Sequence, residues 1–378
     1  PALERSRSGN GGHIWIFFSE PVSARVARQF GSVLITETME RRPEIGFASY
    51  DRLFPNQDIM PLGGFGNLIA LPLQNTARKA GNSVFVDAGM RPYDDQWAYL
   101  SSLPRLSAAA VTKLVEAAEL SGRILGVRMP VDDEQADEPW KMTPSRRSTA
   151  RRLDVPVPPT IKVTIADQIY IDRSELPSAM VAQLVRLAAF QNPEFYRAQA
   201  MRLPTFGKPR IVSCAELHPR HVALPRGSFD EVVGFLSDHG VRAELDDLRE
   251  DGTRLPETVC FRGELRQQQS RAFEALAEHD TGVLAATTAF GKTVVASALI
   301  ARRASNTLVL VHRRELLSQW IERLKSFLQI DPKQIGTIGA GKRKPTGVID
   351  VALIQSLVRK GEVDDIVADY GHLVVDEC

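Results

Sequence analysis

The chain is poor in cysteine and has no long apolar run. Its three cysteines, Cys214, Cys260 and Cys378, are widely spaced and match neither a metal-ligand pair nor a disulfide framework. No apolar stretch approaches the roughly 18 residues of a membrane-spanning helix, and the first residues do not have the pattern of a signal peptide. These absences predict a protein of the reducing cytoplasm that has no membrane partner.

The chain also lacks an excess of either charge. It has 47 lysines and arginines against 46 aspartates and glutamates, which gives a formal net charge of +1. Because this balance produces no overall basic field, contacts with nucleic acid must come from local patches. The 378 residues, 43% hydrophobic and 25% charged, are typical of a globular protein with two to four domains at roughly 100–200 residues each.

Shifts in composition predict a multidomain α/β protein in four parts. Residues 1–127 have mixed α and β patterns, and residues 128–160 are expected to be a linker. Within it, acids, prolines and a basic cluster (Arg146, Arg147, Arg151, Arg152) favour a solvated segment over one that contacts phosphates. Residues 161–258 predict a small α+β domain. Strands alternating with helices over 259–378 predict a parallel sheet covered by helices.

The apolar periodicity also predicts individual elements. The expected strands are His13–Phe18 (as a buried strand), Asn67–Leu73, Ser83–Asp87, Ile161–Ile165, Gln168–Ile171, Gly282–Ala286, Thr307–Val311, Val348–Ile354 and His372–Val375. The expected helices are Ser23–Phe30, Ser107–Leu120, Ser178–Phe190, Ser228–His239, Thr293–Arg302 and Arg313–Phe327.

A phosphate-binding loop is predicted between the apolar run at 282–285 and the helix that follows. Its residues are Ala286-Thr287-Thr288-Ala289-Phe290-Gly291-Lys292-Thr293. Gly291 allows close approach of the backbone, Lys292 supplies a cation for the β- and γ-phosphates, and Thr293 supplies a hydroxyl for Mg²⁺. The helix N-terminus adds a favourable dipole. The strict form of the motif has glycine where this chain has Ala286.

An acidic pair, Asp376 and Glu377, follows the apolar strand at 372–375. In an ATP-driven motor, the first acid holds Mg²⁺ through its water shell and the second activates the attacking water. The alternative is an ordinary strand end with exposed acids. We expect Lys292, Asp376 and Glu377 to be catalytic, with Thr293 and Asp376 as the groups that hold Mg²⁺.

Five segments in order resemble the superfamily 2 helicases and translocases, in the branch with an Asp-Glu-Cys-His box. They are Leu265–Gln269, the phosphate loop, Thr307–Trp320, Asp350–Leu357 and the acidic pair. The resemblance implies that Gln269 reads adenine and that the ATP site comprises Arg266, Gln269 and Ala289–Thr293. It implies that Arg313, Arg314, Gln355 and Ser356 lie along the nucleic acid. The departures are Ala289, where many relatives have glycine, and the missing histidine after Cys378.

A second resemblance covers roughly residues 1–105. Ser8-Gly9-Asn10-Gly11-Gly12-His13 is a glycine-rich turn whose Ser8 and His13 can donate to phosphate oxygens, although a loop with a structural histidine is an alternative. With Asp51 and the runs at 66–73 and 81–87, it resembles the archaeo-eukaryotic primases of TOTE conflict systems. The resemblance implies nucleotide binding by Ser8 and His13. It also implies a metal ligand, for Mg²⁺ or Mn²⁺, at Asp51, which otherwise would cap a turn.

The expected function is an ATP-dependent DNA helicase or translocase fused to a primase-polymerase domain. Its cofactors are ATP and Mg²⁺, and its partners are nucleotides and DNA, with RNA as an alternative to DNA. The alternatives are a nucleotide-dependent DNA-binding module and a restriction-type translocase without polymerase activity. Residues 161–258 are interpreted as a packing module, with DNA engagement as the alternative. Pro1 at the start and the motif cut at Cys378 predict a fragment that binds nucleotide and DNA weakly and is itself inactive. The sequence leaves the oligomeric state open.

Overall fold

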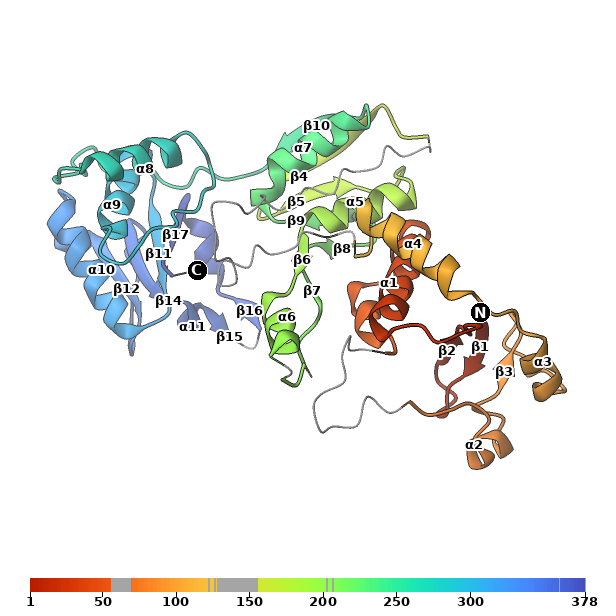
Figure 1. Ribbon diagram of the computed structural model, residues 1–378. Coiled ribbons are helices and arrows are strands. Elements are labelled where there is room, and N and C mark those ends of the chain that lie inside the picture. The colour runs from red at the N-terminus through yellow and green to blue at the C-terminus, as the bar shows by residue number, and fades with distance from the viewer. Residues whose placement is uncertain are drawn as a thin grey trace. The chain divides into compact units, whose positions relative to one another are not determined.

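The protein forms two compact units, Pro1–Asp246 and Asp247–Cys378. The computed structural model describes residues 1–55, 69–121, 123–125, 127, 156–201, 203–205, 207–359 and 361–377 (Figure 1). Most of the expected linker, including its basic cluster, therefore lies outside the described residues. No helix in the described part of the chain is long and apolar enough to cross a membrane.

The first unit begins with a small antiparallel sheet in the order β2-β1-β3. Its strands are β1 (Ala2–Arg5), β2 (Gly12–Trp15) and β3 (Phe85–Val86). The prediction of a buried strand over His13–Phe18 was wrong in extent and burial, because β2 ends at Trp15 and lies at the sheet edge, where Ile14 is 72% exposed. The described part of the expected strand Asn67–Leu73 forms no strand, and its first two residues lie outside the described range.

Two long helices pack together beside this sheet. Helix α1 (Ala24–Arg41) starts at the N-cap Ser23, and α4 (Ala108–Leu120) starts at the N-cap Ser107; each cap side chain accepts a backbone hydrogen bond from the first turn. Phe30 of α1 and Val111 of α4 meet in a shared hydrophobic cluster. The short helices of this region are η1 (Phe47–Arg52), α2 (Asn75–Lys79) and α3 (Gln96–Ser102).

The rest of the first unit is a five-stranded sheet in the order β10-β4-β5-β9-β8. The strands are β4 (Thr160–Ile165), β5 (Ile169–Asp172), β8 (Glu216–Leu217), β9 (His221–Leu224) and β10 (Arg242–Asp247). The accompanying elements are α5 (Ser178–Leu187), β6 (Ala189–Gln191), α6 (Pro193–Ala200), β7 (Ile211–Ser213), η3 (Arg226–Ser228) and α7 (Phe229–Asp238). The predicted strands and helices of this region are present within a few residues of their expected limits.

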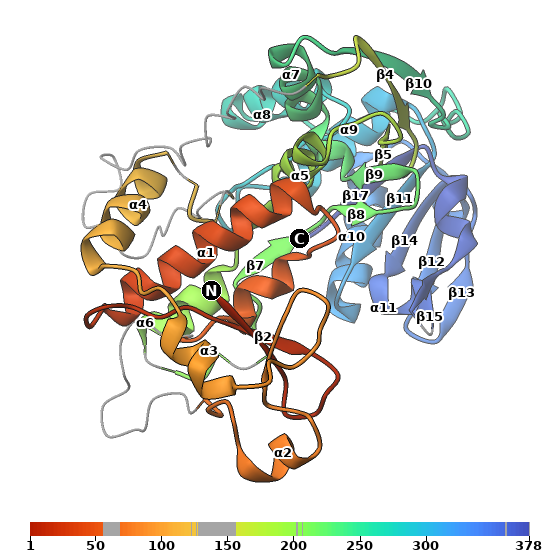
Figure 2. The same cartoon turned by 90° about the vertical axis from the view of Figure 1, so that its right-hand side faces the viewer.

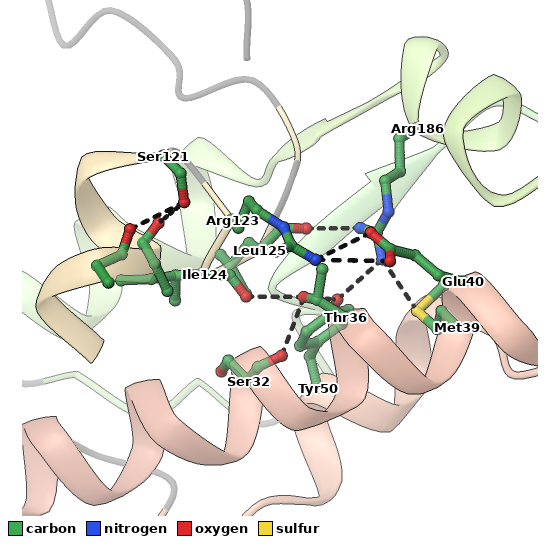
Figure 3. Close-up of polar contacts among 12 residues, drawn as sticks. Ser32, Thr36, Met39, Glu40, Tyr50, Ser121, Arg123, Ile124, Leu125 and Arg186 are labelled. Atoms are coloured by element: carbon green, nitrogen blue, oxygen red, sulfur yellow. Dashed lines mark hydrogen bonds and ion pairs between the residues drawn. The ribbon is translucent and has the colours of Figure 1, made fainter. Parts of the chain in front are cut away.

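Helices α1 and α5 pack against each other, and one hydrophobic core includes residues from both parts of this unit. Met39 and Tyr50 from the first part lie in the same cluster as Ile171 and Leu184 from the second. A partly buried polar junction reinforces the contact (Figure 3). Arg186 of α5 donates to the Leu125 carbonyl at 2.6 Å and to the Tyr50 hydroxyl at 3.2 Å. The sequence-based division at residues 127 and 161 therefore separates segments that share a core.

The second unit is built on a sheet in the order β13-β12-β14-β11-β17, whose strands lie side by side in Figure 2. The strands are β11 (Thr307–Val311), β12 (Ile335–Gly339), β13 (Lys342–Lys344), β14 (Ile349–Leu353) and β17 (His372–Val375). All neighbours are parallel except β12 and β13, which form a hairpin.

The helices of the second unit are α8 (Gln267–Ala277), α9 (Lys292–Arg303), α10 (Arg314–Phe327) and α11 (Ile354–Leu357). Ile300 of α9 and Trp320 of α10 pack on Val309 and Val351 of the central strands. The shorter elements are η4 (Pro332–Gln334), β15 (Val358–Arg359), β16 (Glu362–Val363) and η5 (Asp365–Asp369).

The expected strand at 282–286 was wrong, because these residues are irregular and Val283 is 82% exposed. A short apolar run indicates burial, but a strand also requires a neighbour to pair with. Strand β12 was not predicted. Its two glycines lower strand propensity, and burial between β13 and β14 compensates for them.

Burial of His372 predicts a loss of stability in acid. Burial and the charge of Arg303 lower the pKa of His372 from 6.5 to about 4. As the pH falls below 6.5, the unfolded chain binds a proton that the folded chain binds only near pH 4, so the folded state is progressively disfavoured across this window. We expect the free energy of unfolding of the second unit to fall by up to about 3 kcal/mol from this group between pH 7 and pH 4.

The measurement is urea unfolding of the protein and of His372→Gln at pH 7 and pH 4.5. The Thr307 hydroxyl lies 3.2 Å from His372 Nδ1, and glutamine keeps a polar group near it. The glutamine side chain does not bind a proton in this pH range. It should therefore lose less stability on acidification than the unmodified chain. Equal losses in the two proteins would show that His372 does not contribute to the pH dependence.

Candidate nucleotide and nucleic-acid sites

The predicted phosphate loop has a strained, glycine-dependent conformation at the start of α9. Ala289 and Gly291 both have left-handed backbone angles, with φ of 66° and 93°. A left-handed conformation costs roughly 1–2 kcal/mol for a residue with a Cβ, so the loop tolerates alanine at 289 at an energetic cost. A Cβ at Gly291 would lie 2.5 Å from Gln269 Nε2. Gly291 is therefore required both for its backbone angle and for close packing.

Lys292 and Thr293 occupy the first turn of α9. Gly291 is the N-cap, so unpaired backbone N–H groups and the positive end of the helix dipole are concentrated at this loop. Lys292 is exposed, and its Nζ donates to the Ala286 carbonyl at 3.1 Å. The lysine therefore lies across the loop, where a phosphate oxygen would compete with the carbonyl for its hydrogen bonds.

Gln269, the predicted adenine reader, connects α8 to the phosphate loop. Its side chain is 3% exposed; Oε1 accepts from the Arg266 backbone N–H at 2.9 Å and Nε2 donates to the Phe290 carbonyl at 2.7 Å. The Arg266 guanidinium donates to the same carbonyl. Arg266 and Gln269 therefore hold the loop from one side, and adenine recognition by Gln269 stays a prediction.

The acidic pair lies at the carboxyl end of β17. The Asp376 backbone N–H donates to the Leu310 carbonyl, which continues the pairing with β11. Trp320, 3% exposed on α10, donates its indole N–H to Asp376 Oδ2 at 2.7 Å. The Glu377 carboxylate lies 3.4 Å from His312 Nε2. The motif that contains Trp320 and His312 was predicted from the sequence, but a role for either residue at the acidic pair was not.

The four predicted nucleic-acid residues gather at the same edge of the sheet. Arg313 and Arg314 follow β11, whereas Gln355 and Ser356 follow β14, and these two strands are adjacent and parallel. All four residues are exposed. Gln355 Nε2 donates to the His312 carbonyl at 3.0 Å, which links the two segments directly. Carboxyl ends of parallel strands are the usual binding edge of an open α/β sheet.

Two of the predicted residues could supply ligands for Mg²⁺. Thr293 at the start of α9 and Asp376 after β17 offer hard oxygen atoms, and Trp320 hydrogen-bonds to only one of the Asp376 carboxylate oxygens. Within the described ranges, no group of three or more His, Cys, Asp or Glu side chains is arranged to hold a metal. Mg²⁺ is commonly bound by one or two protein groups together with phosphates and water, so Thr293 and Asp376 would be enough to hold it.

Ser8 and His13 lie on the β1–β2 hairpin. The ends of the Ser6–Gly11 turn are joined by the Ser6 N–H, which donates to the Gly11 carbonyl, and by the Gly11 N–H, which donates to Ser6 Oγ. The Asn10 N–H donates to Ser8 Oγ at 3.4 Å. Gly9 has φ of 81° and approaches Asn82 so closely that a Cβ would lie 2.9 Å from its Oδ1. The His13 side chain is 52% exposed, and its Nδ1 lies 3.3 Å from the Glu4 carboxylate.

Asp51, the predicted metal ligand, interacts with Arg210. Its carboxylate accepts from the Arg210 backbone N–H at 3.1 Å and lies 3.5 Å from the Arg210 guanidinium. Partial burial raises the pKa of Asp51, and the Arg210 contacts oppose that effect. A carboxylate already compensated by arginine is a poor match for a divalent cation in this arrangement. The metal role of Asp51 stays a prediction.

A parallel sheet with a predicted phosphate loop, an acidic pair and exposed basic residues at its carboxyl edge is the arrangement expected of a phosphate-loop nucleotide-binding domain. Comparison with known proteins agrees with this class. Residues 262–378 match the family model "Type III restriction enzyme, res subunit", and residues 1–114 match "TOTE conflict system, Archaeo-Eukaryotic Primase domain". These matches support a TOTE-type archaeo-eukaryotic primase domain fused to a superfamily 2 helicase domain.

Individual relatives match parts of the chain. A helicase-like protein, 109L, of Invertebrate iridescent virus 3 is 28% identical over 143 residues, which is 36% of this chain and 42% of the relative. The DNA 3'-5' translocase XPB2 of Sulfurisphaera tokodaii is 31% identical over 100 residues, 26% of this chain and 22% of the relative. This chain therefore spans less than half of either relative. The UvsW helicase of bacteriophage T4 aligns with a TM-score of 0.43 at 18% identity, covering 58% of this chain and 83% of UvsW.

Proposed function

We propose that the second unit binds ATP with Mg²⁺ and serves as the first motor domain of an ATP-dependent DNA helicase or translocase. The observation that carries the proposal is the gathering of the acidic pair, Arg313 and Gln355 at one edge of a parallel sheet, with the phosphate loop at the start of a helix packed on β17. DNA is the nucleic acid that we propose this edge binds, with RNA as the alternative.

The residues of the ATP site have distinct proposed roles. Lys292 neutralises the phosphates, and Thr293 and Asp376 hold Mg²⁺, which supplies charge compensation for phosphoryl transfer when bound. Glu377 orients and deprotonates the attacking water, while the nearby His312 links it to the strand-binding segment through Gln355. Trp320 restrains the Asp376 carboxylate by a hydrogen bond.

For the first unit we propose a nucleoside triphosphate site at the β1–β2 hairpin. Ser8 and His13 would donate to phosphate oxygens. The N–H groups of Gly9, Asn10 and Gly11, which here donate to Ser6 and Ser8 oxygens, would join them only after exchanging those contacts. Polymerase chemistry there requires divalent metal, Mg²⁺ or Mn²⁺, which Asp51 would help to bind only after exchanging its contacts with Arg210.

Replacing Lys292 by alanine should reduce MgATP binding by about 100-fold, because the phosphates lose charge-assisted hydrogen bonds. Equilibrium binding of a fluorescent ATP analogue to the 378-residue chain provides the measurement. Lys325→Ala is the matched control, since the Lys325 side chain pairs only weakly, at the surface, with Glu322. Unchanged binding in Lys292→Ala would reject the assignment of the ATP site.

The match to a restriction-enzyme subunit favours a second candidate, a restriction-type translocase that lacks polymerase activity. A nucleotide-dependent DNA-binding module is the third. Measurements of DNA-stimulated ATP hydrolysis and of primer synthesis, taken together, separate the three candidates. Hydrolysis with synthesis supports the helicase–primase, hydrolysis alone supports the translocase, and binding without hydrolysis supports the module.

A further inference from the structure

Glu4 places a carboxylate inside the small sheet of the first unit. The residue is 2% exposed and lies on β1, the central strand, between β2 and β3. A buried carboxylate is tolerated only when hydrogen bonds replace the water that it has lost. The groups around Glu4 therefore indicate what this side chain does.

Three groups surround the carboxylate, and all can donate to it. The Trp15 indole N–H donates to Oε2 at 2.5 Å, and the Ser83 hydroxyl donates to Oε1 at 2.9 Å. His13 Nδ1 lies 3.3 Å from Oε2. Because an ionised carboxylate only accepts, the hydrogen bond to His13 requires a proton on Nδ1.

The strand register sets the Glu4–His13 contact. The two residues are directly opposite each other on the antiparallel strands β1 and β2, so their side chains project from the same face. Nε2 lies on the side of the imidazole ring away from Nδ1, and the His13 side chain is 52% exposed. A ring fixed through Nδ1 by a buried carboxylate therefore presents Nε2 away from the sheet interior.

We propose that Glu4 is a positioning residue that keeps the proton on Nδ1 of His13 and directs Nε2 towards the phosphates of a nucleoside triphosphate. The proposal rests on the triphosphate site proposed above for the hairpin. Phosphate oxygens only accept, so a ring that binds them through Nε2 carries protons on both nitrogens. Glu4 then supplies the negative charge that compensates this imidazolium, as carboxylates do behind functional histidines elsewhere.

A purely structural Glu4 makes a different prediction. Trp15 and Ser83 already satisfy both carboxylate oxygens, so in that case the state of the His13 ring would not depend on Glu4. A neutral imidazole in water favours the tautomer with the proton on Nε2. The tautomer of His13 therefore separates a positioning role from a structural one.

The first test needs no substitution at Glu4. Long-range ¹H–¹⁵N correlation spectra of the chain labelled with ¹⁵N-histidine, recorded at pH 8 and assigned with His13→Gln, report the protonated nitrogen of His13. The proposal requires the neutral ring to carry its proton on Nδ1. A neutral ring protonated on Nε2 would overturn it.

The second test follows the His13 signals during titration with inorganic tripolyphosphate, so binding at the hairpin is separated from binding at the phosphate loop. Glu4→Gln keeps the shape and a neutral acceptor, and should retain the tautomer while weakening tripolyphosphate binding by about 10-fold. Glu4→Leu should weaken tripolyphosphate binding as well, and in addition it should move the proton of the neutral His13 ring from Nδ1 to Nε2. Ser83→Ala removes the hydroxyl contact of the Glu4 carboxylate, leaves those of His13 and Trp15, and should change neither property.

Each outcome has a defined meaning. Unchanged tautomer and affinity in both Glu4 variants would show that Glu4 is structural and would overturn the proposal. If tripolyphosphate leaves the His13 signals of the unmodified chain in place, the proposed triphosphate site fails, and the ligand part of this inference fails with it. An Nδ1 proton that is lost in Glu4→Leu would still establish the positioning of the ring.

Discussion

Gly336→Ala should destabilise the second unit by about 3–5 kcal/mol, in the range of the most damaging core substitutions. The structure has no room for a Cβ at this position of β12, because it would lie 1.8 Å from Asp350 Oδ1 and 2.6 Å from the Lys344 carbonyl oxygen. Asp350 is fully buried. The clash therefore falls on a carboxylate and a backbone atom, neither of which can move cheaply.

The hydrogen bonds of Asp350 explain why it cannot yield. Its carboxylate accepts from the Thr346 N–H at 2.9 Å, the Gly347 N–H at 2.8 Å and the Tyr370 hydroxyl. Burial and the proximity of Asp350 raise the pKa of Tyr370, so the phenol stays protonated and keeps donating. Displacing the carboxylate would leave a buried charge without its donors, which is among the costliest defects in a folded protein.

Hydrogen exchange of β11 and β14 under native conditions measures this effect within the second unit. Gly341→Ala is the matched control, because Gly341 also lies at the β12–β13 hairpin but an added Cβ has nothing within 4 Å. The only expected cost is the strain of holding alanine at the positive φ of 79°, which should reduce the stability by about 1 kcal/mol. Equal protection in the two variants would show that the Asp350 cluster rearranges to accept a methyl group.

Two strands of the second unit were predicted to the residue. Strands β11 and β17 are continuous apolar runs that are paired in the sheet, and the bounds of both were predicted correctly. Strand β12 was missed because Gly336 and Gly339 weaken its pattern. Their small size is explained by Asp350 and Leu353 on the neighbouring strand, a tertiary constraint that local sequence does not express.

The candidate site was predictable as a set of motifs but not as a network. The phosphate loop and acidic pair have recognisable residue types at recognisable spacing. The hydrogen bond from Trp320 to Asp376 joins residues 56 positions apart, and the contact between Glu4 and His13 depends on strand register. Neither contact leaves a local signal. The shared core of the first unit was missed for the same reason, since it pairs helices more than a hundred residues apart.

The second large loss of stability is expected at the polar junction of the first unit, where Arg186 contacts Tyr50 and Leu125. Arg186→Met should destabilise this unit by about 2–4 kcal/mol, because the Leu125 carbonyl and the Tyr50 hydroxyl each lose a charged donor. The Tyr50 side chain is fully buried, and its hydroxyl also lies 2.7 Å from Thr36 Oγ1, so water cannot easily replace the guanidinium (Figure 3). Methionine retains most of the aliphatic volume, so the loss reports mainly on the polar contacts.

Urea unfolding followed by hydrogen exchange in α1 and α5 gives the size and location of this loss. Arg220→Ala is the control: the Arg220 side chain is 75% exposed, its distance to Asp172 is 4.0 Å, and its removal should cost no more than about 1 kcal/mol. A double-mutant cycle with Tyr50→Phe isolates the Arg186–Tyr50 contact, for which directly contacting residues typically give coupling of about 0.5–3 kcal/mol. Additive effects in the cycle would show that the two residues stabilise the junction independently. Coupling in the cycle, with loss of protection in both α1 and α5, would instead show that this polar contact stabilises the packing of the two helices against each other.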